Sequence, residues 1–164
     1  MPAWLIAGKA ITELVSAGKY IQPNTVVLPV NFARGGKDIY GQVVTDRNWI
    51  FTHQTAYLGL EKPLIIIDNY EANTGYFPIG WQKDVNPYIH LGNGKDIEGM
   101  AENAEINNYK NSTGVNIDYI LMWCYDSVYL HDEHFAKVYS DIQASYHILY
   151  ISPTRRVILY GLND

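Results

Sequence analysis

The clearest buried strand in the chain is the run Leu64-Ile65-Ile66-Ile67-Asp68. It is continuously apolar up to its final carboxylate, which is typical of a strand covered on both faces. A similar run is Thr25-Val26-Val27-Leu28-Pro29-Val30, and strand character returns over residues 117–124. Pro29 counts against the earlier run, because proline cannot donate a hydrogen bond to a central ladder. With that reservation, the sequence predicts three buried strands.

Helical patterns alternate with these strands. Apolar residues recur at helical spacing over residues 4–18, 49–59, 96–110 and 132–145. The chain ends in two β runs, residues 147–151 and 156–160, joined by the turn Ser152-Pro153-Thr154-Arg155, a pattern that indicates an antiparallel hairpin. Strands alternating with helices imply right-handed crossovers. We therefore predict an α/β, Rossmann-like layered domain: a mostly parallel sheet with a C-terminal antiparallel hairpin.

Composition limits the classes of function. The 164 residues suit one globular domain, residues 1–164, and 48% of them are apolar. Twelve Lys and Arg against seventeen Asp and Glu give a formal net charge of −5, which leaves no basic footprint for nucleic acid. One cysteine excludes an internal disulfide framework. The first residues lack the features of a signal peptide, and no apolar run is long enough to cross a bilayer.

Polar side chains follow the predicted strands at the edge where parallel α/β sheets bind ligands. The candidate ligand-binding residues are Asn31, Arg34, His53, Asp68, Asn69, Tyr70, Glu71 and Asp126. Aromatic residues are in excess, with 14 Tyr and 4 Trp. Six of them are candidates for stacking on sugar rings, although aromatics also fill cores; these are Trp49, Tyr57, Tyr70, Tyr76, Trp81 and Tyr88.

Several of these residues have two interpretations. Asp68 and Glu71 suit acid–base chemistry or a cation, yet Asp68 equally suits a turn cap and Glu71 a solvated surface. His53 is either a functional group or a hydrogen-bonded structural histidine. His131 and His134 have a spacing that two metal ligands can use, but acidic residues at a helix N-terminus explain the same stretch.

No motif specifies a catalytic residue, a metal or a cofactor. Cys124 ends an apolar strand and is interpreted as a buried, inert thiol. The glycine-containing stretches at residues 34–38 and 92–96 match neither a P-loop nor a dinucleotide fingerprint, and tight turns account for them. The catalytic residues therefore stay unknown, and no metal and no cofactor are predicted.

Two stretches carry a resemblance to a known class of domain. They are Tyr20-Ile21-Gln22-Pro23-Asn24-Thr25-Val26-Val27-Leu28-Pro29-Val30-Asn31-Phe32 and the later run 49–81, with Thr52-His53, Tyr57-Leu58-Gly59, Lys62-Pro63, Asp68-Asn69-Tyr70-Glu71 and Gly75-Tyr76-Phe77-Pro78. About a third of the chain thus resembles the soluble C-terminal extramembrane domain of bacterial polytopic membrane glycosyltransferase-like (mannosyltransferase-like) proteins.

This resemblance implies a location, a partner and a ligand. The domain would lie at the extracytoplasmic face of a bacterial membrane, and its partner would be the membrane-embedded remainder of a parent chain. The ligand would be a glycan or a lipid-linked sugar, and the catalytic carboxylates would belong to the membrane portion. Residues 1–164 would then be a single domain excised from that longer protein, with a helix that begins near residue 4.

Three hypotheses of different classes follow. The first is a non-catalytic accessory domain that binds glycan or supports a membrane glycosyltransferase. The second is a small stand-alone α/β hydrolase or transferase that uses Asp68, Glu71, Asp126 and His53, whose sign would be that these side chains meet in one pocket. The third is a protein interaction module with no small ligand, whose sign would be an exposed apolar patch on the first helix and no polar crevice.

Overall fold

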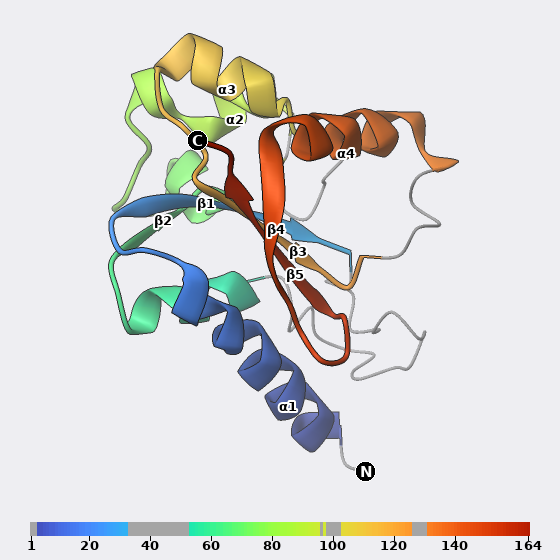
Figure 1. Ribbon diagram of the computed structural model, residues 1–164. Helices are drawn as coiled ribbons and strands as arrows, with labels where there is room; N and C mark the ends of the chain where they lie inside the picture. Colours follow the sequence, from blue (N-terminus) through green and yellow to red (C-terminus); the bar gives the residue numbers. More distant parts are fainter. Residues whose placement is uncertain (1–2, 33–52, 96, 98–102, 126–130) are drawn as a thin grey trace.

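The computed structural model describes residues 3–32, 53–95, 97, 103–125 and 131–164. Its centre is a five-stranded open sheet with the strand order β2-β1-β3-β5-β4 (Figure 1). The strands are β1 (Thr25–Asn31), β2 (Leu64–Ile66), β3 (Tyr119–Trp123), β4 (Tyr146–Ile151) and β5 (Val157–Leu162). The first three strands run parallel, and β5 and β4 add antiparallel pairings. The predicted α/β class and the C-terminal hairpin are confirmed.

Pro29 lies in the central strand β1 without costing a ladder hydrogen bond. In a parallel sheet, alternate residues of a strand face one neighbour or the other. The Val27 carbonyl accepts from the Ile67 N–H at 3.1 Å on the β2 side, and the Val26 carbonyl accepts from the Asp118 N–H at 3.0 Å on the β3 side. Pro29 has the parity of Val27, so its nitrogen faces β2 just past the last paired residue. With no donor at Pro29, pairing stops and the chain leaves the sheet at Asp68.

One face of the sheet is covered by the N-terminal segments. These are the helix α1 (Ala3–Ser16), the 3-10 helix η1 (Ala17–Tyr20) and the 3-10 helix η2 (Gln54–Leu60). Leu14 of α1 is fully buried in a cluster with Leu58 of η2 and Leu121 of β3. The Lys62 ammonium donates to the carbonyls of Gly18 at 2.7 Å and Ile21 at 2.9 Å, which ties η1 to the start of β2.

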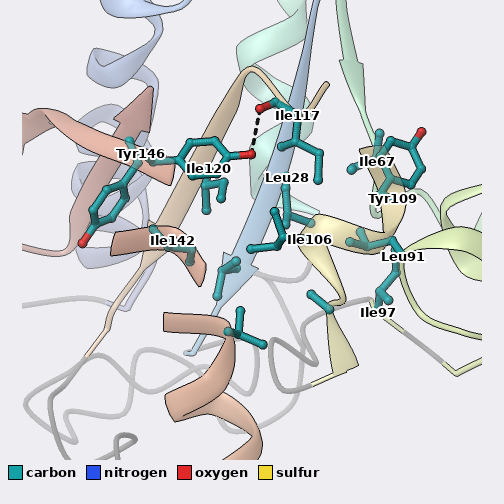
Figure 2. Packing of buried hydrophobic residues seen from close by; sticks show 14 of the residues in the cluster. Leu28, Ile67, Leu91, Ile97, Ile106, Tyr109, Ile117, Ile120, Ile142 and Tyr146 are labelled. Carbon is teal, nitrogen blue, oxygen red and sulfur yellow. Dashed lines mark hydrogen bonds between the residues drawn. The ribbon is translucent and has the colours of Figure 1, made fainter. Parts of the chain in front are cut away.

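The opposite face is covered by the helices α2 (Pro87–His90), α3 (Ile106–Thr113) and α4 (Glu133–Ser145) (Figure 1). Their apolar side chains share a core with the sheet residues Leu28 and Ile120 (Figure 2). The Tyr146 hydroxyl crosses this core and donates to the Ile117 carbonyl at 2.9 Å. Fully burying one side chain such as Ile142 contributes about 1.5–3 kcal/mol. Because each face of the sheet has a cluster of such side chains, both helical layers are held against the sheet.

The helices agree with the sequence patterns to different degrees. The expected helix 132–145 is confirmed as α4, and the expected helix 4–18 ends slightly early as α1 and continues as η1. The helix expected over 49–59 is a 3-10 helix that begins at Gln54, and the residues before 53 lie outside the described part. No helix in the described part of the chain meets the length and hydropathy needed to cross a membrane.

The helix expected over residues 96–110 is confirmed only from Ile106, where α3 begins. Residues 97 and 103–105 are not α-helical, and residues 96 and 98–102 lie outside the described part. Ile97 and Ala104 are buried as loop residues in the same core as Ile106. Their spacing therefore imitates a helical face, because irregular backbone also directs apolar side chains inward.

The segment between β2 and α3 also contains two single-turn 3-10 helices, η3 (Glu71–Asn73) and η4 (Lys83–Val85). Because η3 follows directly after β2, it brings Glu71 to the carboxyl end of that strand. Glu71 is one of the residues of the candidate site described next.

Candidate functional site

A pocket of about 670 Å³ lies beside β2 and extends past the carboxyl end of that strand. Its apolar wall comes from β2 and from the end of η2. Its polar groups come from the start of η2 and from the turn after β2. The described lining residues are His53, Thr55, Ala56, Gly59, Leu60, Leu64, Ile65, Ile66, Asp68, Asn69, Glu71 and Trp81. The volume is within the range of sites for small organic ligands.

Asn69 organises the polar wall of this pocket through two hydrogen bonds. Its side-chain Oδ1 accepts from the Glu71 N–H at 3.0 Å, closing an Asx turn that begins η3. Its main-chain carbonyl accepts from the Trp81 indole N–H at 3.1 Å. Asn69 therefore holds a carboxylate-bearing turn and an aromatic side chain next to each other.

Trp81 is held in place by hydrogen bonds from both its indole and its backbone. Besides the indole bond to Asn69, the Trp81 backbone N–H donates to the Ala72 carbonyl at 3.0 Å. The side chain is half-buried and packs against the core on the α2–α3 side. With its backbone and its ring each held by one hydrogen bond, Trp81 offers a preorganised surface to a ligand, since little further entropy is lost on binding.

His53, Tyr70 and Phe77 form an aromatic row beside the pocket. The His53 and Tyr70 rings are stacked with centroids 5.3 Å apart and planes inclined by 28°. Phe77 meets Tyr70 edge to face at 6.4 Å. Tyr70 is thus the support of His53 rather than one of the residues that line the pocket.

Four of the five buried polar side chains in the described part of the chain belong to the carboxyl ends of β1 and β2 or to the start of η2. They are Asn31, Gln54, Thr55 and Asp68. Gln54 is 1% exposed, and neither atom of its amide has a hydrogen-bond partner. An unsatisfied buried amide costs about 1–3 kcal/mol. Gln54 lies between His53 and Thr55 in the chain, and both of these neighbours line the pocket.

The structure brings four of the predicted site residues together. His53, Asp68, Asn69 and Glu71 line the pocket, and Tyr70 stacks on His53. Asn31 is buried at the end of β1, in register with Trp123 of β3. Arg34 and Asp126 lie outside the described residues.

Two residues of this site were missed from the sequence. Gln54 and Thr55 read only as neighbours of His53 in a helical pattern, and no spacing rule marked them as buried. The only available signal was the polar run Thr52-His53-Gln54-Thr55 between apolar residues, and such runs also occur at many solvated positions. Trp81, in contrast, was already among the aromatics proposed for sugar stacking.

The surroundings of Asp68 and Glu71 bear on the two interpretations that the sequence left open for them. Asp68 is buried, and the Tyr88 hydroxyl donates to its main-chain carbonyl at 3.0 Å. Glu71 is half-buried at the pocket wall, whereas the turn interpretation expected it in solvent. Asn69, the residue after Asp68, caps the turn by accepting from the Glu71 N–H.

The remaining titratable candidates lie elsewhere. His131 and His134 are both exposed, and the Asp132 carboxylate between them accepts from the Phe135 N–H at 2.9 Å, so the stretch begins α4 as an N-cap. Cys124 is buried at the end of β3 with a left-handed φ of 54°. Within the described ranges, no three His, Cys, Asp or Glu side chains gather as a metal site.

No protein-family model matches the sequence, and comparisons with curated proteins and with solved structures find no match.

Proposed function

We propose that this chain is a non-catalytic accessory domain that binds carbohydrate in the pocket beside β2. The observation that carries the proposal is the Trp81 indole at a pocket wall that also holds Asp68, Asn69 and Glu71. A pyranose has an apolar C–H face that packs on an aromatic ring and a rim of hydroxyls that need polar partners. This wall supplies both kinds of contact side by side.

The apolar part of the pocket supports the same ligand class. Leu64, Ile65 and Ile66 of β2 line it together with Leu60. Ligand sites are mostly apolar surfaces with a few placed polar groups, and the latter fix orientation. At about 670 Å³ the pocket has room for one or two sugar rings. A mono- or disaccharide unit is therefore the ligand size that we propose.

We infer that the domain is Rossmann-like and acts beside a membrane-embedded glycosyltransferase-like partner. The three parallel strands in the order β2-β1-β3, with helices on both faces, support the fold. The partner, the extracytoplasmic location and the lipid-linked sugar rest on the resemblance carried by residues 20–32 and 49–81. In that arrangement the domain would hold a glycan while the partner transfers the sugar.

One observation favours a second function, that of a small hydrolase or transferase. His53, Asp68 and Glu71, three of the four side chains proposed for catalysis, line the same pocket. A histidine with two carboxylates can serve as a general acid and base. Release of free sugar from an oligosaccharide by the purified chain, abolished by Asp68→Asn, would favour this function over the accessory one.

The third hypothesis, a protein interaction module, expected an exposed apolar patch on the first helix. Leu14 and Ala10, in the part of α1 with described side chains, are instead buried against the sheet. Ala10 and Leu14 therefore do not contribute to such a patch, and the side chains of residues 3–7 lie outside the described part of the chain.

The test of the accessory function is sugar binding by Trp81 variants. We expect Trp81→Ala to weaken oligosaccharide binding at least about tenfold, because an aromatic contact contributes about 0.5–1.5 kcal/mol beyond its buried area. The measurement is titration calorimetry or NMR shift mapping with a panel of neutral, amino and acidic sugars. Tyr57→Ala is the matched control, since Tyr57 is exposed on η2 and does not line the pocket.

A folding change is separated from a binding change by Trp81→Phe. That variant keeps an aromatic face and removes only the indole hydrogen bond to Asn69, so it should retain most of the affinity. If Trp81→Ala binds sugar as tightly as the unaltered chain, or if no sugar of the panel binds, the proposed function is wrong.

A further inference from the structure

We infer that the pocket selects a sugar bearing a positively charged amino group, so that its preferred ligand is an amino sugar. The inference rests on the proposed function, because it names the class of carbohydrate. It is carried by three features of the pocket: two carboxylates, an aromatic wall and an apolar floor. Each of these acts on a cation in a different way.

The charged groups of the pocket have one sign. Asp68 and Glu71 both line it, and among its described lining residues there is no Lys or Arg. A ligand with a carboxylate or phosphate would meet a like charge at Glu71, whereas an ammonium would meet an opposite one. The formal net charge of −5 adds a favourable long-range field for a cationic ligand.

The Glu71 carboxylate is available to a ligand. The Glu71 backbone is fully engaged, because its N–H donates to Asn69 Oδ1 at 3.0 Å and its carbonyl accepts from the Thr74 hydroxyl at 3.1 Å. Its side-chain oxygens, by contrast, have no hydrogen bond or salt bridge to any residue that the structure describes. The turn therefore fixes the position of the carboxylate without neutralising it.

The surroundings strengthen an ion pair with this carboxylate. Trp81 lines the same wall, and the face of an indole attracts an ammonium group through its ring quadrupole. Leu64 and Ile66 lower the local dielectric, so the attraction between Glu71 and an ammonium exceeds its value in open water. Asn69 keeps its side-chain NH₂ group for a sugar hydroxyl, because only its oxygens are used in the turn.

The experiment compares four monosaccharides by NMR titration: glucosamine, glucose, N-acetylglucosamine and glucuronic acid. At about pH 6 the amine of glucosamine is protonated, since amino groups beside electron-withdrawing substituents, such as the α-amino group of a peptide, titrate near 8. We expect glucosamine to bind at least about tenfold more tightly than glucose or N-acetylglucosamine, and glucuronic acid to bind most weakly. Added salt should reduce the preference for glucosamine, because it screens charges that are not fully buried.

Glu71→Gln is the decisive variant. It keeps the shape of the side chain and removes its charge, so it should lower the affinity for glucosamine about tenfold and leave the affinity for glucose unchanged. Glu133→Gln is the matched control, because Glu133 is exposed at the start of α4 and does not line the pocket. That variant should bind all four sugars as the unaltered chain does.

The outcomes separate this inference from the proposed function. If glucose binds as tightly as glucosamine, or if Glu71→Gln weakens both equally, the selection of an ammonium group is wrong while carbohydrate binding stands. If none of the four sugars nor any longer oligosaccharide binds, the proposed function itself fails. Preferential binding of glucuronic acid would also overturn the inference.

Discussion

At the scale of single residues, the backbone is most constrained at Gly92. This glycine follows α2, its N–H donates to the Pro87 carbonyl at 2.9 Å, and its carbonyl accepts from the Lys95 N–H at 2.8 Å. A Cβ at Gly92 would lie 2.5 Å from the Lys95 carbonyl oxygen and 2.7 Å from Ile97 Cγ2. Both neighbours belong to a loop that delivers Ile97 to the core, so neither can move freely.

We therefore expect Gly92→Ala to lower the free energy of unfolding by about 1–3 kcal/mol, the usual cost of forced overpacking. Urea denaturation followed by circular dichroism measures it. Gly75→Ala is the control, because a Cβ at Gly75 has nothing within 4 Å. Equal stability of the two variants would show that the turn at residues 92–95 yields more easily than its geometry implies.

At the scale of elements, the helix α4 is stabilised by its N-cap residue, Asp132. Asp132 has an extended backbone and its carboxylate accepts from the Phe135 N–H, so it satisfies a donor that the helix itself leaves free. Glu133 adds a second negative charge in the first turn, where the helix dipole favours it. This cap fixes the register that directs Phe135, Val138 and Ile142 into the core.

Asp132→Ala should destabilise the protein by about 1 kcal/mol, the typical cost of losing an N-cap. Thermal or urea unfolding gives the difference. Asp84→Ala removes an equal charge from the exposed 3-10 helix η4, where Asp84 is not the cap residue, and should change stability by less. Asp132→Asn should restore most of the loss, whereas a purely electrostatic role would leave it as unstable as the alanine variant.

At the scale of the whole molecule, buried tyrosines make the fold sensitive to alkali. Burial raises the pKa of Tyr109, Tyr146 and Tyr160, and the nearby Asp118 carboxylate raises that of Tyr146 further. The pKa of Tyr160 is raised further by Tyr139, whereas a hydrogen bond with Gln143 lowers it. All three hydroxyls are neutral in the folded protein at pH values where an unfolded chain, with pKa near 10, begins to ionise.

The sign of the pH effect follows from these raised values. Since the folded pKa exceeds the unfolded one, the stabilisation is complete below about pH 10 and is lost as the pH rises towards the folded value. We expect the free energy of unfolding, measured in urea at about pH 8 and about pH 11, to fall less steeply for Tyr146→Phe than for the unaltered chain.

The same variant has a separate cost at neutral pH. Tyr146→Phe leaves the Ile117 carbonyl without its donor, which should cost about 1–2 kcal/mol. Tyr76→Phe is the control for both effects, because Tyr76 is 86% exposed. If the two variants lose stability with pH at the same rate, ionisation of the buried phenol is not the cause.

Much of the fold was accessible from sequence because its elements are local. The Asp132 cap and the hairpin around Pro153 each depend on residues close in the chain. The run Leu64 to Asp68 forms a strand only over Leu64–Ile66 at the edge of the sheet, and Ile65 is 48% exposed, so the prediction that this strand is buried on both faces is wrong. The pattern over residues 96–110 included Ile97 and Ala104, which are buried without being α-helical, because their burial depends on where the chain packs and not on a helical period. Pro29 counted against an interior strand, but β2 ends before it would need a hydrogen bond from the Pro29 nitrogen. The length of the neighbouring strand cannot be read from the residues around Pro29.

The candidate site divides in the same way between chain and tertiary structure. By itself the sequence determined the α/β class, the strand ends and the polar residues that follow them, since these are set by local pattern and by the rules of parallel sheets. Only the tertiary structure decided that His53 shares a pocket with Asp68 and Glu71, that Trp81 is hydrogen-bonded to Asn69, and that Gln54 is buried. These relations join residues 12 or more positions apart or depend on burial, and side-chain type does not encode which distant segment packs against it.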